Sequence, residues 1–166
     1  YDCFESALRH APRMIAAQAT SVETVDSKVL NLARTDIIWH SISDLIQDVP
    51  GKDMQGLNMV EYNSNDLDEI KARIARLEEE LSAAAATGEY GVIGYQLTYD
   101  RADINKIYAM RKKSVGLLGN TKGSQKPIAF AEDTGVPPEN LADFIMEFRA
   151  LLDSHGLQYG MFGHVD

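Results

Sequence analysis

The fold class is set most clearly by Leu57-Asn-Met-Val-Glu-Tyr62 and by the run that follows it, Leu67-Asp-Glu-Ile-Lys-Ala-Arg-Ile-Ala-Arg-Leu-Glu-Glu-Glu-Leu81. The first part alternates apolar and polar residues toward its end, which predicts a strand. In the second part the apolar residues recur at steps of three and four, which predicts an amphipathic helix. This helix should begin at a cap within 63–66 and end at Gly88. A strand leading directly into a helix is therefore the unit from which the rest of the chain is interpreted.

The flanking segments extend this pattern in both directions. Toward the C-terminus we predict strands over 91–98, 127–133 and 157–163, and helices from Asp100 to Gly119 and from Pro137-Pro138 to Gly156. Toward the N-terminus we predict a helix over 2–10 that ends before Pro12 and then a strand within 14–25. A helix capped by Asp26 or Ser27 should follow and end at Arg34, and a further helix should lie within 37–46. The polar, glycine-containing segment 120–126 predicts a mobile loop. Strands and helices alternate after residue 55, and this order alone favours a parallel α/β sheet.

Bulk composition narrows the class of protein. The 166 residues suffice for one domain, and 45% of them are hydrophobic. A net charge of −9 disfavours nucleic acid as a partner, because phosphates attract basic surfaces. No apolar run approaches the ~20 residues of a transmembrane helix. The single cysteine, Cys3, excludes an internal disulfide and a zinc site built from cysteines, and it fits a cytoplasmic, reducing compartment.

Few residues suggest chemistry on spacing alone. His164 follows Gly163 at the end of a predicted strand, where it is most simply a loop histidine. Arg111 is most simply a surface residue of an amphipathic helix. Glu132-Asp133 would point to opposite sides of an extended chain, which makes a poor catalytic pair. No glycine-rich motif typical of a nucleotide-binding loop is present.

Three segments together resemble the C-terminal, or cap, region of FAD-linked oxidases. They are Ile107-Tyr-Ala-Met-Arg111, Pro127-Ile-Ala-Phe-Ala-Glu-Asp-Thr-Gly-Val-Pro137 and Tyr159-Gly-Met-Phe-Gly-His164. In that family the Gly-His pair opens a longer Gly-His-x-x-x-Gly-x-x-His motif. The resemblance implies an α+β fold, a ferredoxin-like antiparallel sheet covered by helices on one face. It also implies that residues 1–166, which begin with Tyr1 and not Met, are one domain, a fragment of that cap, with FAD bound mainly by another domain of the same polypeptide.

The resemblance also implies an activity, the oxidation of a D-2-hydroxy acid such as D-lactate or D-2-hydroxyglutarate to the 2-oxo acid. Arg111 would contact the substrate carboxylate, and His164 would be a ligand of zinc or manganese, with further ligands outside this chain. Two positions depart from the family pattern: Tyr108 stands where tryptophan is common, and Ala131 stands where several members have a lysine. The run Glu132-Asp-Thr-Gly-Val-Pro137 resembles large bacterial members that carry an iron–sulfur region, so electrons would leave through such an acceptor, in the cytoplasm or peripherally at the inner membrane.

A second class of function stays open at the level of sequence. Small α+β domains host many functions, so the chain could instead be a non-catalytic binding or oligomerisation module. The sequence leaves the particular hydroxy acid, the metal and the oligomeric state undetermined.

Overall fold

A three-stranded antiparallel sheet organises the chain. The structure is a computed structural model that describes all residues except 120, 122, 125, 129 and 133. The central strand β1 (Ser21–Asp26) pairs with β2 (Gly56–Glu61) on one side and β3 (Phe162–His164) on the other, in the order β2-β1-β3. Val22 lies opposite Val60, and Glu23 lies opposite His164. The first and last thirds of the chain therefore meet within one sheet.

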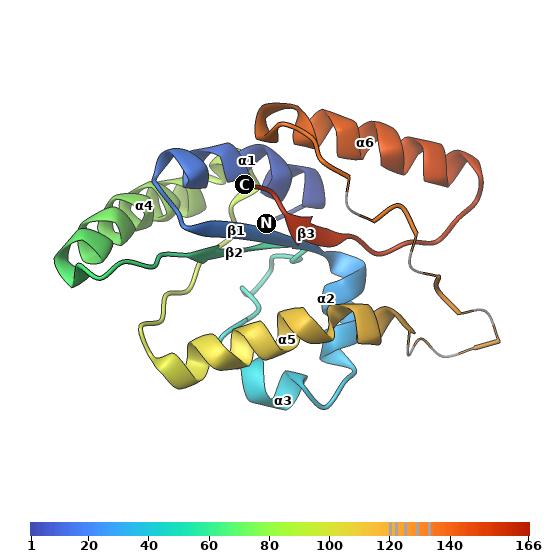
Figure 1. Cartoon of the computed structure of the whole chain (residues 1–166), viewed down its shortest axis with the longest axis horizontal. Coiled ribbons are helices and arrows are strands. Elements are labelled where there is room, and N and C mark those ends of the chain that lie inside the picture. The colour runs from blue at the N-terminus through green and yellow to red at the C-terminus, as the bar shows by residue number, and fades with distance from the viewer. Residues whose placement is uncertain (120, 122, 125, 129, 133) are drawn as a thin grey trace.

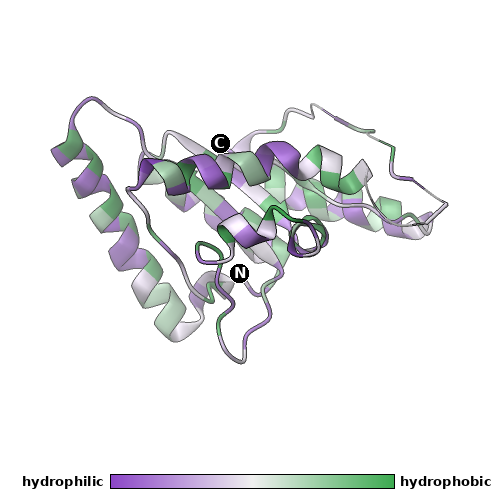
Figure 2. Ribbon diagram, turned by 90° about the horizontal axis from the view of Figure 1, so that it is seen from below, coloured by the Kyte–Doolittle hydropathy of each residue, from purple (hydrophilic) through white to green (hydrophobic). Residues whose placement is uncertain are grey.

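Helices cover both faces of this sheet (Figure 1). One face carries α1 (Phe4–Ala16), α4 (Leu67–Thr87) and α6 (Pro138–Ser154), and the other carries α2 (Ser27–Arg34), α3 (Trp39–Ile42) and α5 (Arg101–Gly119). A short 3-10 turn, η1 (Glu89–Gly91), follows α4. Apolar and polar stretches alternate along the helices in Figure 2, as expected where one side of a helix is buried.

Each face of the sheet has its own core. On the first face the fully buried Val22 packs with Leu8 and Met14 of α1. On the second face Val25 packs with Val29 and Leu30 of α2. Successive residues of a strand point to opposite sides, so Val22 and Val25 anchor opposite layers. Full burial of such side chains contributes about 1.5–3 kcal/mol each.

Several predicted helix boundaries are confirmed. The Asp26 side chain accepts a hydrogen bond from the Val29 N–H at 2.9 Å and so caps α2. Asp66 caps α4 through two backbone N–H groups, and Gly88 ends that helix with φ 74°, a left-handed conformation that glycine adopts without strain. Asp100 accepts hydrogen bonds from the first turn of α5.

The predicted α+β class with an antiparallel sheet is confirmed, and the parallel arrangement favoured by alternation is wrong. β1 was absent from that alternation, and it separates β2 from β3, pairing antiparallel with both. The helices also cover two faces instead of the expected one. Both faces of β1 carry buried side chains, including Val22 and Val25, so each face needs a covering layer.

Other local predictions are wrong. α1 continues through Pro12, because its extension buries Met14 and this outweighs one lost backbone hydrogen bond. Residues 91–98 form no strand, and the segment instead connects η1 to the start of α5 without pairing with the sheet. Of the strand predicted over 127–133, residues 129 and 133 lie outside the described residues, and the described ones are not extended into a sheet. Of the loop predicted over 120–126, residues 120, 122 and 125 also lie outside the described residues.

None of the described helices is both long enough and apolar enough to cross a membrane.

Candidate functional site

Two residues singled out in the sequence, Arg111 and His164, lie together on the second face of the sheet. The Arg111 Nη2 atom lies 3.5 Å from His164 Nε2 although 53 positions separate the residues. Glu23 on the central strand joins them. Arg111 Nε donates a hydrogen bond to Glu23 Oε2, and Glu23 Oε1 lies 3.3 Å from His164 Nε2. We call Arg111, Glu23 and His164 the polar triad.

The sheet register explains why the triad forms. Glu23 lies directly opposite His164 across the β1–β3 ladder, and Val25 lies opposite Phe162. The alternation of β3 thus places Phe162 and His164 on one side of the sheet. Phe162 packs against the core of the second face, so the strand is fixed by an apolar contact next to the exposed histidine.

Helix α5 supplies the third member. Its buried Met110 and Leu117 anchor one side of the helix in the core. Arg111 follows Met110 and reaches over the sheet, with 30% of its side chain exposed. Burial of the neighbouring helix positions therefore determines where this guanidinium can point.

Exposure differs sharply among the three side chains. Glu23 is 13% exposed, whereas His164 is 56% exposed. A carboxylate withdrawn from water needs a charged or hydrogen-bonding partner, and Arg111 provides it. The other ring nitrogen of His164, Nδ1, lies 3.4 Å from Asp166 Oδ1 and 3.5 Å from Ser21 Oγ. The cluster therefore offers an accessible imidazole and guanidinium above a shielded carboxylate.

Tyr108 flanks the triad one helical turn before Arg111. Its hydroxyl donates a hydrogen bond to Glu61 Oε2 at the end of β2. Burial, and after it the hydrogen bond to Glu61, raises the pKa of Tyr108 to about 12. The phenol stays protonated at neutral pH and keeps that bond. Tyrosine in place of the family's tryptophan thus ties α5 to the sheet by a polar contact.

The described residues do not complete a metal site. His164 is a suitable zinc or manganese ligand and Glu23 is its neighbour, but no group of three or more histidine, cysteine, aspartate or glutamate side chains able to hold an ion occurs among them. The iron–sulfur expectation likewise has no set of cysteines here, since Cys3 is the single one.

The remaining histidines lie elsewhere. His10 is fully buried in α1, where its Nδ1 atom lies 2.8 Å from the Tyr1 hydroxyl, and its ring stacks on Tyr90. His40 lies in α3 and His155 directly follows α6, and both are exposed. Glu132 is exposed, and Asp133 lies outside the described residues.

Glu23 is the residue that the sequence did not reveal. The available signal was a charged side chain between Val22 and the buried pair Thr24-Val25 in a short strand. A lone glutamate at such a position does not identify its partners, because they come from residues 111 and 164.

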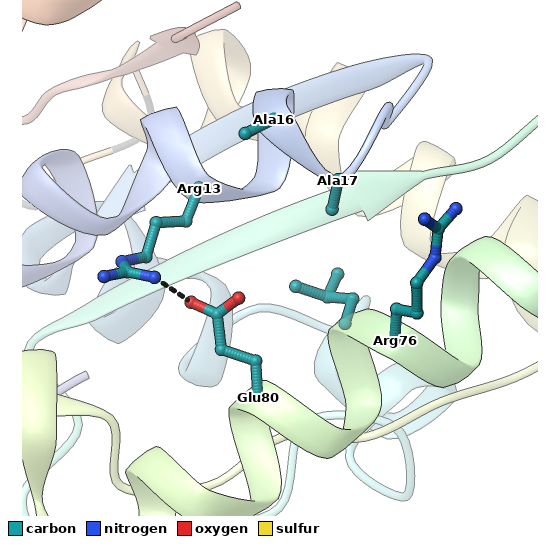
Figure 3. Close-up of a pocket in the computed structure, with 6 residues that line it drawn as sticks. Arg13, Ala16, Ala17, Arg76 and Glu80 are labelled. Atoms are coloured by element: carbon teal, nitrogen blue, oxygen red, sulfur yellow. Dashed lines mark hydrogen bonds and ion pairs between the residues drawn. The ribbon is translucent and has the colours of Figure 1, made fainter.

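A separate hollow of about 250 Å³ lies between α1 and α4, on the other face of the sheet (Figure 3). An ion pair of 3.1 Å between Arg13 Nη1 and Glu80 Oε1 spans it. None of the residues that the sequence singled out lines this hollow, so the triad remains the candidate site.

Comparison with known proteins identifies the family to which this α+β domain belongs. The family model described as FAD linked oxidases, C-terminal domain, matches residues 1–166, and the chain belongs to this family. No solved structure matches the chain significantly.

Curated relatives in several bacteria are named D-2-hydroxyglutarate dehydrogenase. The chain is 63% identical to that of Escherichia coli (strain K12), 57% identical to that of Haemophilus influenzae and 45% identical to that of Pseudomonas putida, in each case over all 166 residues. The chain spans 16% of the length of these relatives. The family inferred from the three sequence segments is thereby confirmed.

Proposed function

We propose that the protein containing this domain is an FAD-dependent dehydrogenase of D-2-hydroxy acids, with D-2-hydroxyglutarate as the first candidate substrate. The observation that carries the proposal is the convergence of Arg111 and His164 on one face of the sheet. The names of relatives up to 63% identical support the substrate class. D-Lactate is the second candidate.

The chemistry removes a hydride from C2 of the substrate and a proton from its hydroxyl, which leaves a 2-oxo acid. FAD, which would be bound mainly by a domain outside this chain, would act as the hydride acceptor. Arg111 binds the substrate carboxylate, because a guanidinium donates two parallel hydrogen bonds to such a group. Holding the carboxylate fixes the orientation of C2, and fixed orientation lowers the entropic part of the barrier.

His164 is proposed as one ligand of a zinc or manganese ion whose other ligands lie outside this chain. Its 56% exposed ring and its position at the end of β3 leave a nitrogen accessible to such an ion. We also propose an iron–sulfur electron acceptor in the same polypeptide and a cytoplasmic location, at most peripheral to the inner membrane. Metal, iron and acid-labile sulfide analysis of the purified protein, with cell fractionation, tests these three points.

A substrate panel tests the proposed function. Full-length protein is mixed with a redox dye and with D-2-hydroxyglutarate, D-lactate, glycolate or the L-enantiomers. We expect dye reduction with a D-2-hydroxy acid, fastest with D-2-hydroxyglutarate, and little with the L-enantiomers. A flavin-containing protein that reduces dye with none of them contradicts the proposal and favours a non-catalytic binding or oligomerisation module.

A further inference from the structure

We propose that Glu23 is a positioning residue, which rotates the Arg111 guanidinium so that its Nη1–Nη2 edge is presented to the substrate carboxylate. The inference rests on the proposed function, since it assigns a role relative to the substrate that Arg111 would bind. It adds a third side chain, from the central strand, to the two that the sequence suggested.

The argument begins with the position of Glu23 in the sheet. β1 is hydrogen-bonded on both sides, to β2 and to β3, so Glu23 stands on the strand whose backbone is most constrained. Its side chain is only 13% exposed, and both carboxylate oxygens have partners, Arg111 on one and His164 on the other. A side chain fixed in this way can hold a flexible arginine in one orientation.

The second step concerns the atoms of Arg111. A guanidinium has two edges that can grip a carboxylate, one formed by Nε and an Nη atom and one by the two Nη atoms. Glu23 takes Nε. Among the described residues none accepts a hydrogen bond from Nη1, and Nη2 has only the 3.5 Å contact with His164. The edge that remains available is therefore the Nη1–Nη2 edge, on the same side as the exposed imidazole.

A purely structural role for Glu23 is the alternative, in which the ion pair simply fastens α5 to the rest of the domain. The chain provides a matched control for that role. Lys113, two residues after Arg111 on α5, pairs with Asp36 through Nζ and Oδ1 at 2.5 Å, and the Asp36 side chain is 21% exposed. Asp36→Ala removes one carboxylate that anchors α5 and leaves Arg111 unchanged.

The experiment uses the full-length protein and steady-state dye reduction with D-2-hydroxyglutarate. Glu23→Ala should raise KM about tenfold or more, the size expected for a misaligned charge-assisted hydrogen bond, with a smaller change in kcat. Glu23→Gln should stay within about threefold of wild type, because its amide oxygen still accepts from Nε. Asp36→Ala should leave KM unchanged. Flavin content and thermal melting are measured for every variant.

A double-mutant cycle shows whether Glu23 acts through Arg111. In an Arg111→Ala background, Glu23→Ala should have no further effect on KM. An equal effect in both backgrounds overturns the proposal. So does a KM that is unchanged or lower in Glu23→Ala, since a lower value means that Glu23 competes with the substrate for the guanidinium. A rise in KM that Asp36→Ala reproduces also overturns it.

The cycle also separates this inference from the proposed function. If Arg111→Ala raises KM but Glu23→Ala does not, the positioning role fails and the substrate site stands. If Arg111→Ala itself leaves KM unchanged, the proposed site fails.

Discussion

His164 is the last residue of β3, and its side chain lies at the surface of the domain. Its partner across the ladder, Glu23, is shielded, while the histidine itself remains 56% exposed. A side chain at the end of a strand contributes little to the core, so the fold does not depend on an imidazole at this position. A role in ligand binding is consistent with this combination of fixed backbone and accessible ring.

His164→Ala in the full-length protein should lower both bound zinc or manganese and the oxidation of hydroxy acids, while leaving flavin content unchanged. Loss of one neutral nitrogen ligand weakens a metal shell, whereas in the proposed function FAD is held mainly by another domain. Elemental analysis and the flavin absorption spectrum measure the two quantities. Metal content and activity equal to wild type would return His164 to the status of an ordinary surface residue.

At the scale of elements, two glycines show how the stability of a helix depends on backbone conformation, one inside α5, which carries Arg111, and one at the end of α4. Gly116 lies inside α5 with open space around its would-be Cβ, and Gly88 ends α4 with φ 74° and similarly open space. An alanine side chain would therefore meet no neighbouring atom at either position. The two glycines differ only in backbone conformation, one helical and one left-handed.

Gly116→Ala should stabilise the domain by up to about 1 kcal/mol, because alanine favours the helix and restricts the unfolded chain. Gly88→Ala should destabilise it by about 1–2 kcal/mol, because an L side chain is strained at that φ. Urea unfolding of residues 1–166 measures both. Shifts of the same sign in the two variants would contradict the backbone assignment.

Sequence patterns captured the local elements of this fold better than their arrangement. The helix 67–87 and the helix 101–119 were predicted from periodicity and caps, because both signals depend on neighbouring residues. The segment 91–98 has the composition of a strand but pairs with no strand of the sheet and connects η1 to α5, which is a matter of tertiary arrangement. For the same reason Arg111 and His164 could be named from the resemblance, whereas Glu23 required the β1–β3 register.

At the scale of the whole molecule, we expect folding of this domain to be independent of FAD. We predict that residues 1–166 fold when produced alone, since each face of the sheet has its own buried cluster. They should neither retain FAD nor reduce dye with D-2-hydroxy acids, because no phosphate-binding glycine loop is present in the sequence. Circular dichroism and flavin absorbance test this. A yellow, active fragment would contradict it.

The buried His10 should make this domain less stable below neutral pH. Burial lowers the pKa of His10, an effect that Glu80 partly opposes. The unfolded chain, with a histidine pKa of about 6.5, then binds the proton more readily than the folded chain. Stability from the neutral ring is therefore complete above about pH 6.5 and is lost as the pH falls toward the lowered pKa, by at most about 1.4 kcal/mol per pH unit.

Urea unfolding between pH 7 and pH 5 measures this dependence, with His10→Gln as the control that should flatten it. Burial raises the pKa of Asp26, which gives a contribution of opposite sign that is present in both proteins. The difference between them isolates His10. Identical pH profiles would contradict the assignment.

The claim that Arg111 binds the substrate carboxylate is tested most directly by flavin reduction in the full-length protein under anaerobic conditions. Wild type and Arg111→Lys are mixed with increasing D-2-hydroxyglutarate, and the loss of the oxidised flavin band is followed. Lysine keeps the charge and the helix but loses the planar fork, so the second-order rate constant of flavin reduction, kred/Kd, should fall about 10- to 150-fold, equivalent to about 1.5–3 kcal/mol. The same concentration dependence and rate in both proteins would contradict the account.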